Sequence, residues 1–373
     1  MKVGIVGWRG MVGSVLLNRM IAEGDFDNID PTFFSTSQAG ASAPDIGKKI
    51  NNNLCQDAND IEKLAENQII ISTQGGDYTK EIHPKLRQAN WNGYWIDAAS
   101  TLRMADNSMI VLDPVNRDVI DNSLRNGIKD YIGGNCTVSL LLMALIGLIR
   151  SNQVEWISSM TYQAASGAGA PAMRELLLQM QVISQQVDQL LHDPKSNILT
   201  IDQEINNVLS QNKMPIEKIG YPLAGNVLPW IDSELPNGQS REEWKGGAEA
   251  NKILALPQIL PIDGLCIRVG TLRCHSQALT IKLKSPMSID QAEEYIKNGN
   301  QWVKFVPNHR EQSLNELSPA AVSGKLDIKI GRLREMNLGK EYLSCFTVGD
   351  QLLWGAAEPL RRILRIIIDY KEL

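Results

Sequence analysis

Cys136 is the candidate nucleophile of this chain. It lies in the motif GGNCTVS (residues 133–139), directly before the apolar run 140–149, where a loop is expected to enter a helix. Unpaired N–H groups at a helix start favour a thiolate and lower the pKa of a cysteine. Most free cysteines are simply small buried residues. Position alone, and not composition, therefore sets Cys136 apart from the other four cysteines.

A thiol nucleophile usually requires a base. The chain has four histidines, and His275 lies in RCHSQ (273–277), at the start of an expected strand over 278–283. It shares strand parity with the apolar Leu279 and Ile281. A buried core histidine is therefore an equally good interpretation of these residues alone.

A glycine-rich turn near the N-terminus indicates a nucleotide site. The sequence GIVGWRGMVG (4–13) follows a short apolar run and precedes helical spacing from Met11. Glycines in such a turn let the backbone approach a pyrophosphate, and the N–H groups of the following helix point at it. The spacing is GxxGxxG and not GxGxxG, so a glycine-rich packing turn is the alternative.

The end of the second expected strand favours NADP over NAD. It reads FFSTSQ (33–38) and offers hydroxyls where an NAD site usually has Asp or Glu for the ribose 2′-hydroxyl. Arg9 lies in the glycine turn. Small hydroxyls and a guanidinium suit a 2′-phosphate.

Two sheets are expected to position these residues. Short apolar runs over 2–6, 32–35, 69–72, 94–96 and 109–112 alternate with helical stripes, which predicts a parallel sheet with helices on both faces. After residue 133, the long strand-like runs 156–164 and 265–283 are more typical of an antiparallel sheet. Apolar stripes over 173–191 and 353–367 predict two long helices that pack in a core or on another subunit.

Composition narrows the class of protein. The 373 residues fit two domains of ordinary size. A net charge of -5 argues against nucleic acid as the main partner. The five cysteines show no CxxC spacing, so neither a disulfide framework nor a metal site is expected. The chain starts without the apolar run of a signal peptide, and its longest apolar run, 138–149, is too short to span a bilayer. We expect a cytoplasmic protein without a membrane partner.

Nine stretches together resemble the aspartate-semialdehyde dehydrogenases of the Gram-negative bacterial type. They are GWRGMVG, FFSTSQ, QGGDY, GGNCTVS, TYQAASG, NGQSREEWKG, DGLCIRVG, LRCHSQA and FTVGDQLLWGAAEPLRR. The resemblance extends from residue 1 to about residue 365. The occurrence of GGNCTVS and RCHSQ in one chain, in this order, is highly specific.

The resemblance implies an α/β protein with a glyceraldehyde-phosphate-dehydrogenase-like architecture. A Rossmann-like NADP-binding domain would occupy residues 1–134, and an α+β catalytic and dimerisation domain residues 135–355. A C-terminal helix, 356–373, would return to the first domain. The family forms homodimers through the second domain.

The resemblance also implies a reaction. The family converts β-aspartyl phosphate and NADPH reversibly to aspartate β-semialdehyde and phosphate, on the route to lysine, threonine, methionine and diaminopimelate. Carried onto this chain, Cys136 attacks the aldehyde or acyl-phosphate carbon and forms a thioester. His275 is the acid and base, and Gln163 orients the bound intermediate.

Ligand contacts are implied residue by residue. Arg268 would bind the substrate carboxylate with a fork that lysine lacks, and Glu242 the amine, while Arg103 and Lys245 would bind phosphate. The implied cofactor contacts are Arg9, Gly10, Met11, Val12, Thr36, Ser37, Gln74, Ser166, Gly167, Pro194 and Gln351. The stretch AGAPAM (168–173) departs from the commoner SGGGARHM pattern and lacks its basic pair, which puts local cofactor contacts in doubt.

Two other functions fit parts of the pattern. An N-acetyl-glutamyl-phosphate reductase shares the glycine turn, the cysteine and the acyl-phosphate chemistry, but its substrate has no free amine, so Glu242 would have no purpose. A catalytically inactive NADP sensor would keep the glycine turn and would need neither Cys136 nor His275.

Overall fold

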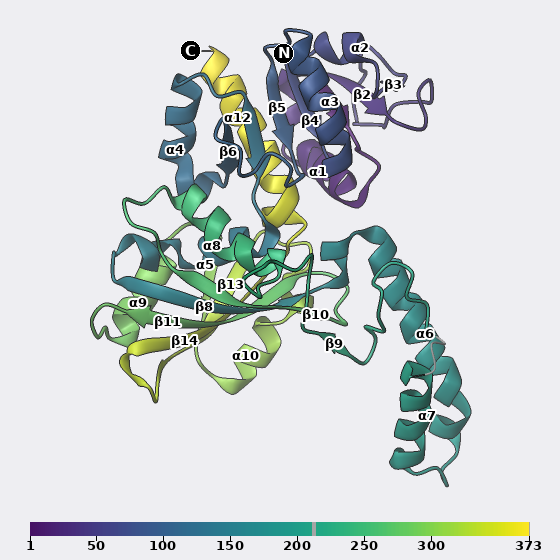
Figure 1. Ribbon diagram of the computed structural model, residues 1–373, viewed down its shortest axis with the longest axis vertical. Coiled ribbons are helices and arrows are strands. Elements are labelled where there is room, and N and C mark those ends of the chain that lie inside the picture. Colours follow the sequence, from purple (N-terminus) through teal and green to yellow (C-terminus); the bar gives the residue numbers. More distant parts are fainter. Residues whose placement is uncertain (211–213, 373) are drawn as a thin grey trace.

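Two sheets and a projecting helical arm make up the molecule. The computed structural model describes residues 1–210 and 214–372. One sheet is built from strands within residues 2–133 and the other from strands within residues 154–349. Figure 1 shows the first sheet with its helices above the second, and the arm at the lower right.

The first sheet is entirely parallel, as the alternating pattern predicted. Its strands, in spatial order, are β3 (Gln56–Asp57), β2 (Asp30–Ser35), β1 (Lys2–Val6), β4 (Ile69–Ser72), β5 (Tyr94–Asp97), β7 (Asp130–Gly133) and β6 (Ser108–Val111). Every residue of β4, β5 and β7 is buried, because both faces of such a sheet are covered. The order runs outward from β1 on both sides, so a crevice is expected at the carboxyl end of β1.

Helices cover this sheet and include the last one of the chain. They are α1 (Met11–Ala22), α2 (Ile61–Ala65), α3 (Gly76–Gln88), α4 (Asp113–Arg125), α12 (Glu358–Glu372) and the short η1 (Asp25–Asn28). The C-terminal α12 packs against α1 and α4 and against β5 and β7. Two buried carboxylates hold it there, with Arg361 on Asp25 at 3.0 Å and Arg362 on Asp113 at 2.6 Å.

The second sheet is mixed and not simply antiparallel. Its spatial order is β12 (Val303–Val306), β13 (Ile328–Met336), β14 (Gly339–Gly349), β11 (His275–Leu283), β8 (Val154–Gln163), β10 (Ile262–Val269) and β9 (Val227–Leu228). β8 pairs antiparallel with β11 and parallel with β10. The expected single run 265–283 is therefore wrong. It divides at the turn 270–274 into strands on opposite sides of β8, and the left-handed φ of 76° at Cys274 marks this break.

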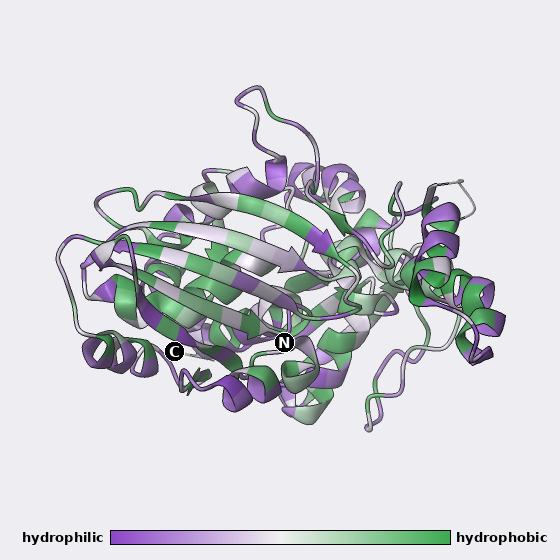
Figure 2. Ribbon diagram, turned by 90° about the horizontal axis from the view of Figure 1, so that it is seen from below, coloured by the Kyte–Doolittle hydropathy of each residue, from purple (hydrophilic) through white to green (hydrophobic). Residues whose placement is uncertain are grey.

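Helices pack against this sheet and carry the site. They are α5 (Cys136–Arg150), α8 (Arg241–Leu254), α9 (Ile289–Lys297), α10 (Arg310–Glu316) and α11 (Pro319–Val322). Residues 138–149 of α5 lie in one hydrophobic core with apolar residues of β8, β11, β13 and α8. Figure 2 shows a broad face of the sheet on which hydrophobic and hydrophilic residues alternate along the strands. The core fixes α5, and with it Cys136.

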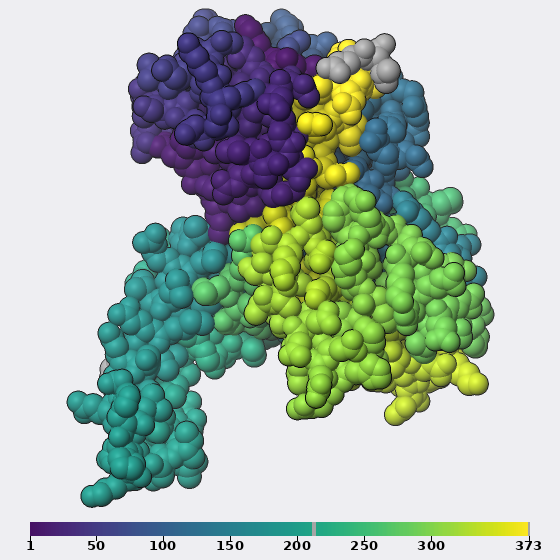
Figure 3. Space-filling model, turned by 180° about the vertical axis from the view of Figure 1, so that it is seen from behind, coloured from purple at the N-terminus to yellow at the C-terminus, as the bar shows by residue number. Residues whose placement is uncertain are grey.

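A long helix is found where the stripe 173–191 predicted one. α6 (Ala170–His192) follows the short η2 (Ala165–Ala168) and packs against α7 (Ile198–Ser210). Figures 1 and 3 show that this pair extends away from both sheets. Within the described residues, no helix is long and apolar enough to cross a bilayer. The remaining element, η3 (Leu353–Ala357), leads into α12.

Candidate active site

The largest group of predicted site residues surrounds one cavity. This cavity has a volume of about 410 Å³ and is lined from both parts of the molecule. Among its lining are the predicted residues Val12, Arg103, Cys136, Gln163, Ser166, Gly167, Glu242, Lys245, Arg268 and Gln351. Residues more than 300 positions apart in the sequence therefore meet here.

Cys136 is the first residue of α5, as its sequence position suggested. Asn135 caps this helix, and its side-chain oxygen accepts hydrogen bonds from the N–H groups of Thr137 at 2.9 Å and Val138 at 3.2 Å. Asparagine before an apolar helical run is a recognised N-cap signal. The cap was therefore visible in the sequence, although Asn135 was not among the predicted site residues.

The pKa of the Cys136 thiol is raised, whereas the position of this residue at a helix start suggested a lowered pKa. Burial raises this pKa to about 12, and the nearby Glu242 carboxylate raises it further. Arg103, Arg268 and Lys245 act in the other direction without overcoming these effects. In the ligand-free chain the sulfur therefore carries its proton, and attack requires that the proton be removed.

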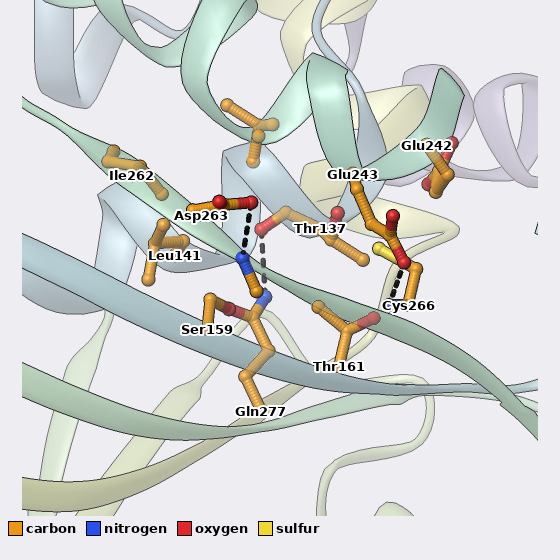
Figure 4. A pocket seen from close by; sticks show the side chains of 13 residues that line it. Thr137, Leu141, Ser159, Thr161, Glu242, Glu243, Ile262, Asp263, Cys266 and Gln277 are labelled. Carbon is orange, nitrogen blue, oxygen red and sulfur yellow. Dashed lines mark hydrogen bonds between the residues drawn. The ribbon is translucent and has the colours of Figure 1, made fainter. Parts of the chain in front are cut away.

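A polar side chain of the second sheet hydrogen-bonds to the first turn of α5. Gln277 donates to the carbonyl of Thr137 at 2.8 Å and accepts a hydrogen bond from Ser159 at 3.2 Å. These residues border a small cavity of about 20 Å³ beside Cys266 and Glu243, shown in Figure 4. The hydrogen bond from Gln277 fixes the backbone directly after the nucleophile.

His275 begins β11 and is fully buried. Its Nδ1 accepts a hydrogen bond from the backbone N–H of Ala164 at 3.0 Å. Burial lowers the pKa of the ring to about 3, and Arg268 lowers it further. The ring is therefore neutral, and because Nδ1 accepts, the proton is assigned to Nε2.

The Nε2 atom of His275 faces Gly167, which lines the cavity. A Cβ on Gly167 would lie 3.1 Å from this nitrogen and 2.8 Å from a terminal nitrogen of Arg268. Nε2 has no hydrogen-bond partner within residues 1–210 and 214–372. His275 is not itself among the residues that line the cavity, so in the ligand-free chain this donor is buried next to Gly167.

Glu242 connects several of the predicted residues. Its Oε1 accepts hydrogen bonds from Asn135 at 2.9 Å and from Gln163 at 3.3 Å, and its Oε2 pairs with Lys245 at 3.0 Å. Burial alone would raise the pKa of Glu242, but Lys245 and the two amides lower it overall. The carboxyl group of Glu242 therefore stays ionised in the wall of the cavity.

Asp232 is a lining residue that the sequence did not reveal. Its carboxylate binds the ammonium of Lys245 at 2.7 Å, so this lysine lies between two acids. Asp232 adopts a left-handed φ of 73° in the loop before α8. No motif or periodicity in the sequence marks Asp232. Its contact with Lys245, which forms only in the folded chain, is what identifies it.

The two predicted arginines are held in different ways. Arg268 donates to the carbonyl of Ala164 at 2.9 Å and has no carboxylate partner within the described part of the chain. Burial lowers the pKa of Arg268. Arg103 donates to the carbonyls of Gly133 and Ala98 and to the carboxylate of Glu249. Both arginines line the cavity, and Arg268 is the one free to bind an anion with most of its N–H groups.

A second cavity, of about 250 Å³, lies at the carboxyl ends of β1, β2 and β4. Its lining includes the predicted residues Arg9, Gly10, Thr36, Ser37 and Gln74. Gly10 caps α1 without a side-chain hydrogen bond, so the first N–H groups of the helix remain available to an anion. Gly7 has a φ of 79°, and a Cβ there would lie 2.7 Å from the nitrogen of Gln74. Glycine at position 7 therefore lets the turn pack closely against the backbone that follows β4.

The far end of this cavity combines hydroxyls with a guanidinium. Arg9 donates to the hydroxyl of Ser35 at 2.8 Å and lies 5.0 Å from the ring of Trp8. Gln74 donates to the hydroxyl of Thr36 at 3.3 Å. Met11 begins α1 between this cavity and the larger one, which Val12 lines. The predicted cofactor residues at the N-terminal turn are thus divided between the two cavities.

Gln351 and Ser166 are in contact and both line the larger cavity. Pro194 is not in the lining of either cavity. Gln351 donates to the hydroxyl of Ser166 and accepts from the N–H of Cys274 at 2.7 Å. Pro194 follows α6, whose 23 residues correspond to roughly 34 Å of helix. The cofactor contact of Pro194 therefore stays a prediction.

Comparisons with known proteins agree with this arrangement. Residues 2–123 match a family model described as semialdehyde dehydrogenase, NAD binding domain, and residues 145–354 match one described as semialdehyde dehydrogenase, dimerisation domain. The structure of an aspartate semialdehyde dehydrogenase from Francisella tularensis is 51% identical, covers 98% of this chain and 99% of its own, and has a TM-score of 0.94.

Two more distant structures share the fold. Aspartate semialdehyde dehydrogenase II from Vibrio cholerae, complexed with ASA, is 22% identical with a TM-score of 0.78, and covers 99% of this chain and 98% of its own. An aspartate semialdehyde dehydrogenase with NADP from Candida albicans is 16% identical with a TM-score of 0.66, and covers 100% of this chain and 99% of its own.

Proposed function

The chain belongs to the aspartate-semialdehyde dehydrogenases, within the semialdehyde dehydrogenase family, and on that premise we propose its reaction, cofactor and residue roles. The reaction is the reversible NADPH-dependent reductive dephosphorylation of β-aspartyl phosphate to aspartate β-semialdehyde and phosphate. One observation carries this proposal: Cys136 faces a cavity that also holds the buried Arg268, which lacks a carboxylate partner among the described residues.

The charges of the cavity complement those of the substrate. A buried arginine without an acid partner suits the α-carboxylate, which it can bind with two N–H groups. Glu242 provides the anion for the α-ammonium, and Arg103 and Lys245 provide cations for the phosphate. A zwitterion removed from water requires both signs of charge nearby, since its desolvation is otherwise uncompensated.

Cys136 forms the covalent intermediate in this proposal. In the oxidative direction its sulfur bonds to the aldehyde carbon, and the thiol proton ends on the aldehyde oxygen, which gives a thiohemiacetal. NADP, which Arg9, Gly10, Ser166 and Gln351 would hold, would supply the hydride acceptor for this carbon, and His275 would take the hydroxyl proton as the thioester forms. A phosphate oxygen then attacks the thioester carbon, the carbon–sulfur bond breaks, and the sulfur regains a proton. Gln163, at the end of β8, orients the acyl group.

His275 is the proposed acid and base for these reaction steps. In the resting chain its Nε2–H is a donor, so it can hydrogen-bond to the aldehyde oxygen as negative charge develops there. A neutral imidazole donor of this kind has precedent in enzymes whose histidine pKa is strongly lowered. To accept the thiol proton at Nε2, the ring must first give up the proton that it carries, by changing tautomer and losing the hydrogen bond from Ala164.

NADP is the proposed cofactor because β2 is not followed by an Asp or Glu that would bind the ribose 2′-hydroxyl of NAD. Arg9 and the hydroxyls of Ser35, Thr36 and Ser37 surround the place where a ribose 2′-phosphate would lie. The uncapped start of α1 suits the pyrophosphate. Ser166, Gly167 and Gln351 are the proposed contacts at the nicotinamide end.

The biological setting is part of the same proposal. We propose a homodimer formed through the mixed-sheet domain, because residues 145–354 match a dimerisation domain. We propose a cytoplasmic role in lysine, threonine, methionine and diaminopimelate biosynthesis. Size-exclusion chromatography with light scattering tests the dimer, since a monomer at micromolar concentration would contradict it.

The deciding assay is phosphate-dependent reduction of NADP with aspartate semialdehyde, followed at 340 nm. We expect turnover that depends on both phosphate and the aldehyde. N-acetyl-glutamate semialdehyde is the matched comparison, because it presents no free ammonium to Glu242. Turnover of this second aldehyde alone would overturn the proposed function.

A further inference from the structure

Glu249 is a buried acid on the same face of α8 as two predicted site residues. Lys245 and Glu249 follow Glu242 by three and seven positions, which places the three residues along one side of the helix. Glu249 is 2% exposed. Unlike Glu242 and Lys245, it does not line the cavity, so its function must be carried by the groups that it binds.

One oxygen of Glu249 holds the backbone next to the nucleophile. Its Oε2 accepts a hydrogen bond from the N–H of Asn135 at 2.7 Å. Asn135 is the N-cap of α5, and its own side chain binds the next N–H groups of that helix. Glu249 therefore fixes the residue directly before Cys136.

The other oxygen of Glu249 holds the phosphate-binding candidate Arg103. Its Oε1 accepts a hydrogen bond from a terminal nitrogen of Arg103 at 3.3 Å. The same guanidinium donates to Gly133 at 2.6 Å and to Ala98 at 3.1 Å. A guanidinium has five N–H groups in a plane, so these three contacts fix that plane and leave two N–H groups for an anion.

We infer that Glu249 is a positioning residue that couples Arg103 to the helix start that carries Cys136. This inference rests on the proposed function, in which Arg103 binds phosphate. A single carboxylate sets both the angle of the Arg103 fork and the position of the backbone at Asn135. The phosphate oxygen and the thioester carbon are thereby held in a fixed relation, which an attack geometry requires.

Glu249→Gln tests this role, because the amide keeps the size of the side chain and removes one of its two acceptors. Either Asn135 or Arg103 then loses its partner. We expect the KM for phosphate to rise at least about tenfold, since a charge-assisted hydrogen bond is lost. The KM for NADP should change less than about twofold.

Glu175→Gln is the matched control. Glu175 is also buried, lies within α6, and accepts hydrogen bonds from the N–H groups of Lys218 at 2.7 Å and Ile219 at 2.8 Å. This variant should lower the melting temperature and leave the KM for phosphate unchanged. An equal rise in both variants would show that Glu249 acts only on stability.

A double-mutant cycle with Arg103→Lys shows whether Glu249 acts through Arg103. Independent sites have additive effects, whereas coupled sites do not. In the Arg103→Lys background we expect Glu249→Gln to change the KM for phosphate less than about threefold. A full tenfold effect there would overturn the coupling. If Glu249→Gln does not fold, Glu249→Asp replaces it. A KM for phosphate in Glu249→Asp equal to that of the wild type would likewise overturn the inference.

Titration calorimetry with inorganic phosphate separates this inference from the proposed function, because it requires no aldehyde. We expect wild-type protein to bind phosphate at least about tenfold more tightly than Glu249→Gln. If the wild type binds phosphate in this way yet does not oxidise aspartate semialdehyde, the proposed function fails and the role of Glu249 stands. If the wild type is active and phosphate affinity is the same in both proteins, the role of Glu249 fails.

Discussion

Replacement of Arg268 by Lys tests the core of the proposed substrate site. Arg268 gives one N–H group to the carbonyl of Ala164 at 2.9 Å. A guanidinium has five N–H groups, so four remain for a substrate carboxylate. Lysine keeps the positive charge but cannot form the two parallel hydrogen bonds of the arginine fork.

The expected loss follows from one charge-assisted hydrogen bond, which contributes about 1.5–3 kcal/mol. At about 1.4 kcal/mol per factor of ten, kcat/KM for aspartate semialdehyde should fall about 10- to 100-fold. Both constants should change. KM should rise because ground-state binding is lost, and kcat should fall because Ala164, which Arg268 holds, also binds the ring of His275.

Initial rates of NADP reduction at saturating phosphate measure this effect. Arg361→Lys is the control, since Arg361 is similarly buried but pairs with Asp25 beneath α12. It should lower the melting temperature and change kcat/KM less than about twofold. A folded Arg268→Lys protein that loses less than threefold, or that changes only the KM for NADP, would refute the assignment.

Three further outcomes are expected. Cys136→Ala should lose turnover while it still binds NADP, and Cys345→Ala, which alters a buried core cysteine, should stay active; normal turnover of Cys136→Ala would exclude the thioester. Arg9→Ser should reduce the preference for NADP over NAD at least about tenfold in kcat/KM, because Arg9 borders the proposed 2′-phosphate site; an unchanged ratio would rule out that contact. The pKa of Cys136 is raised to about 12, so its alkylation by iodoacetamide in the ligand-free chain should keep accelerating from pH 8 to pH 11, with Cys136→Ala as the background; a plateau near pH 7 would show a thiolate at rest.

Local pattern predicted the parallel sheet well. The apolar runs 2–6 and 69–72 became β1 and β4 with unchanged bounds, because a strand buried on both faces is a continuous apolar run that ends at glycine or a polar residue. β7 (Asp130–Gly133) was missed because its four residues include only two large apolar side chains. The pairing of β8 with β10 could not be predicted, since a strand pattern does not name its partner.

The site divides in a similar way. Cys136, Gln163 and Arg268 were identified through motifs, and all three line one cavity. Asp232 was missed because only its contact with Lys245 distinguishes it from a surface acid. Glu249, which contacts Arg103, was missed as well. Glu249 did have a signal, because it lies seven residues after Glu242 on one helix face. The raised pKa of Cys136 was also beyond the sequence, because it depends on the groups that the folded chain places around the half-buried thiol.

The backbone of Ala164 shows why side-chain motifs alone could not describe this site. Its carbonyl accepts a hydrogen bond from Arg268, and its N–H donates to His275. One backbone unit thus sets the direction of the proposed carboxylate ligand and the tautomer of the proposed acid. Because both contacts use main-chain atoms, no substitution at position 164 other than proline, which lacks the N–H, would remove either of them directly. A displaced Arg268 should therefore disturb His275 through the backbone of Ala164, which is the physical reason to expect a loss in kcat and not only in KM.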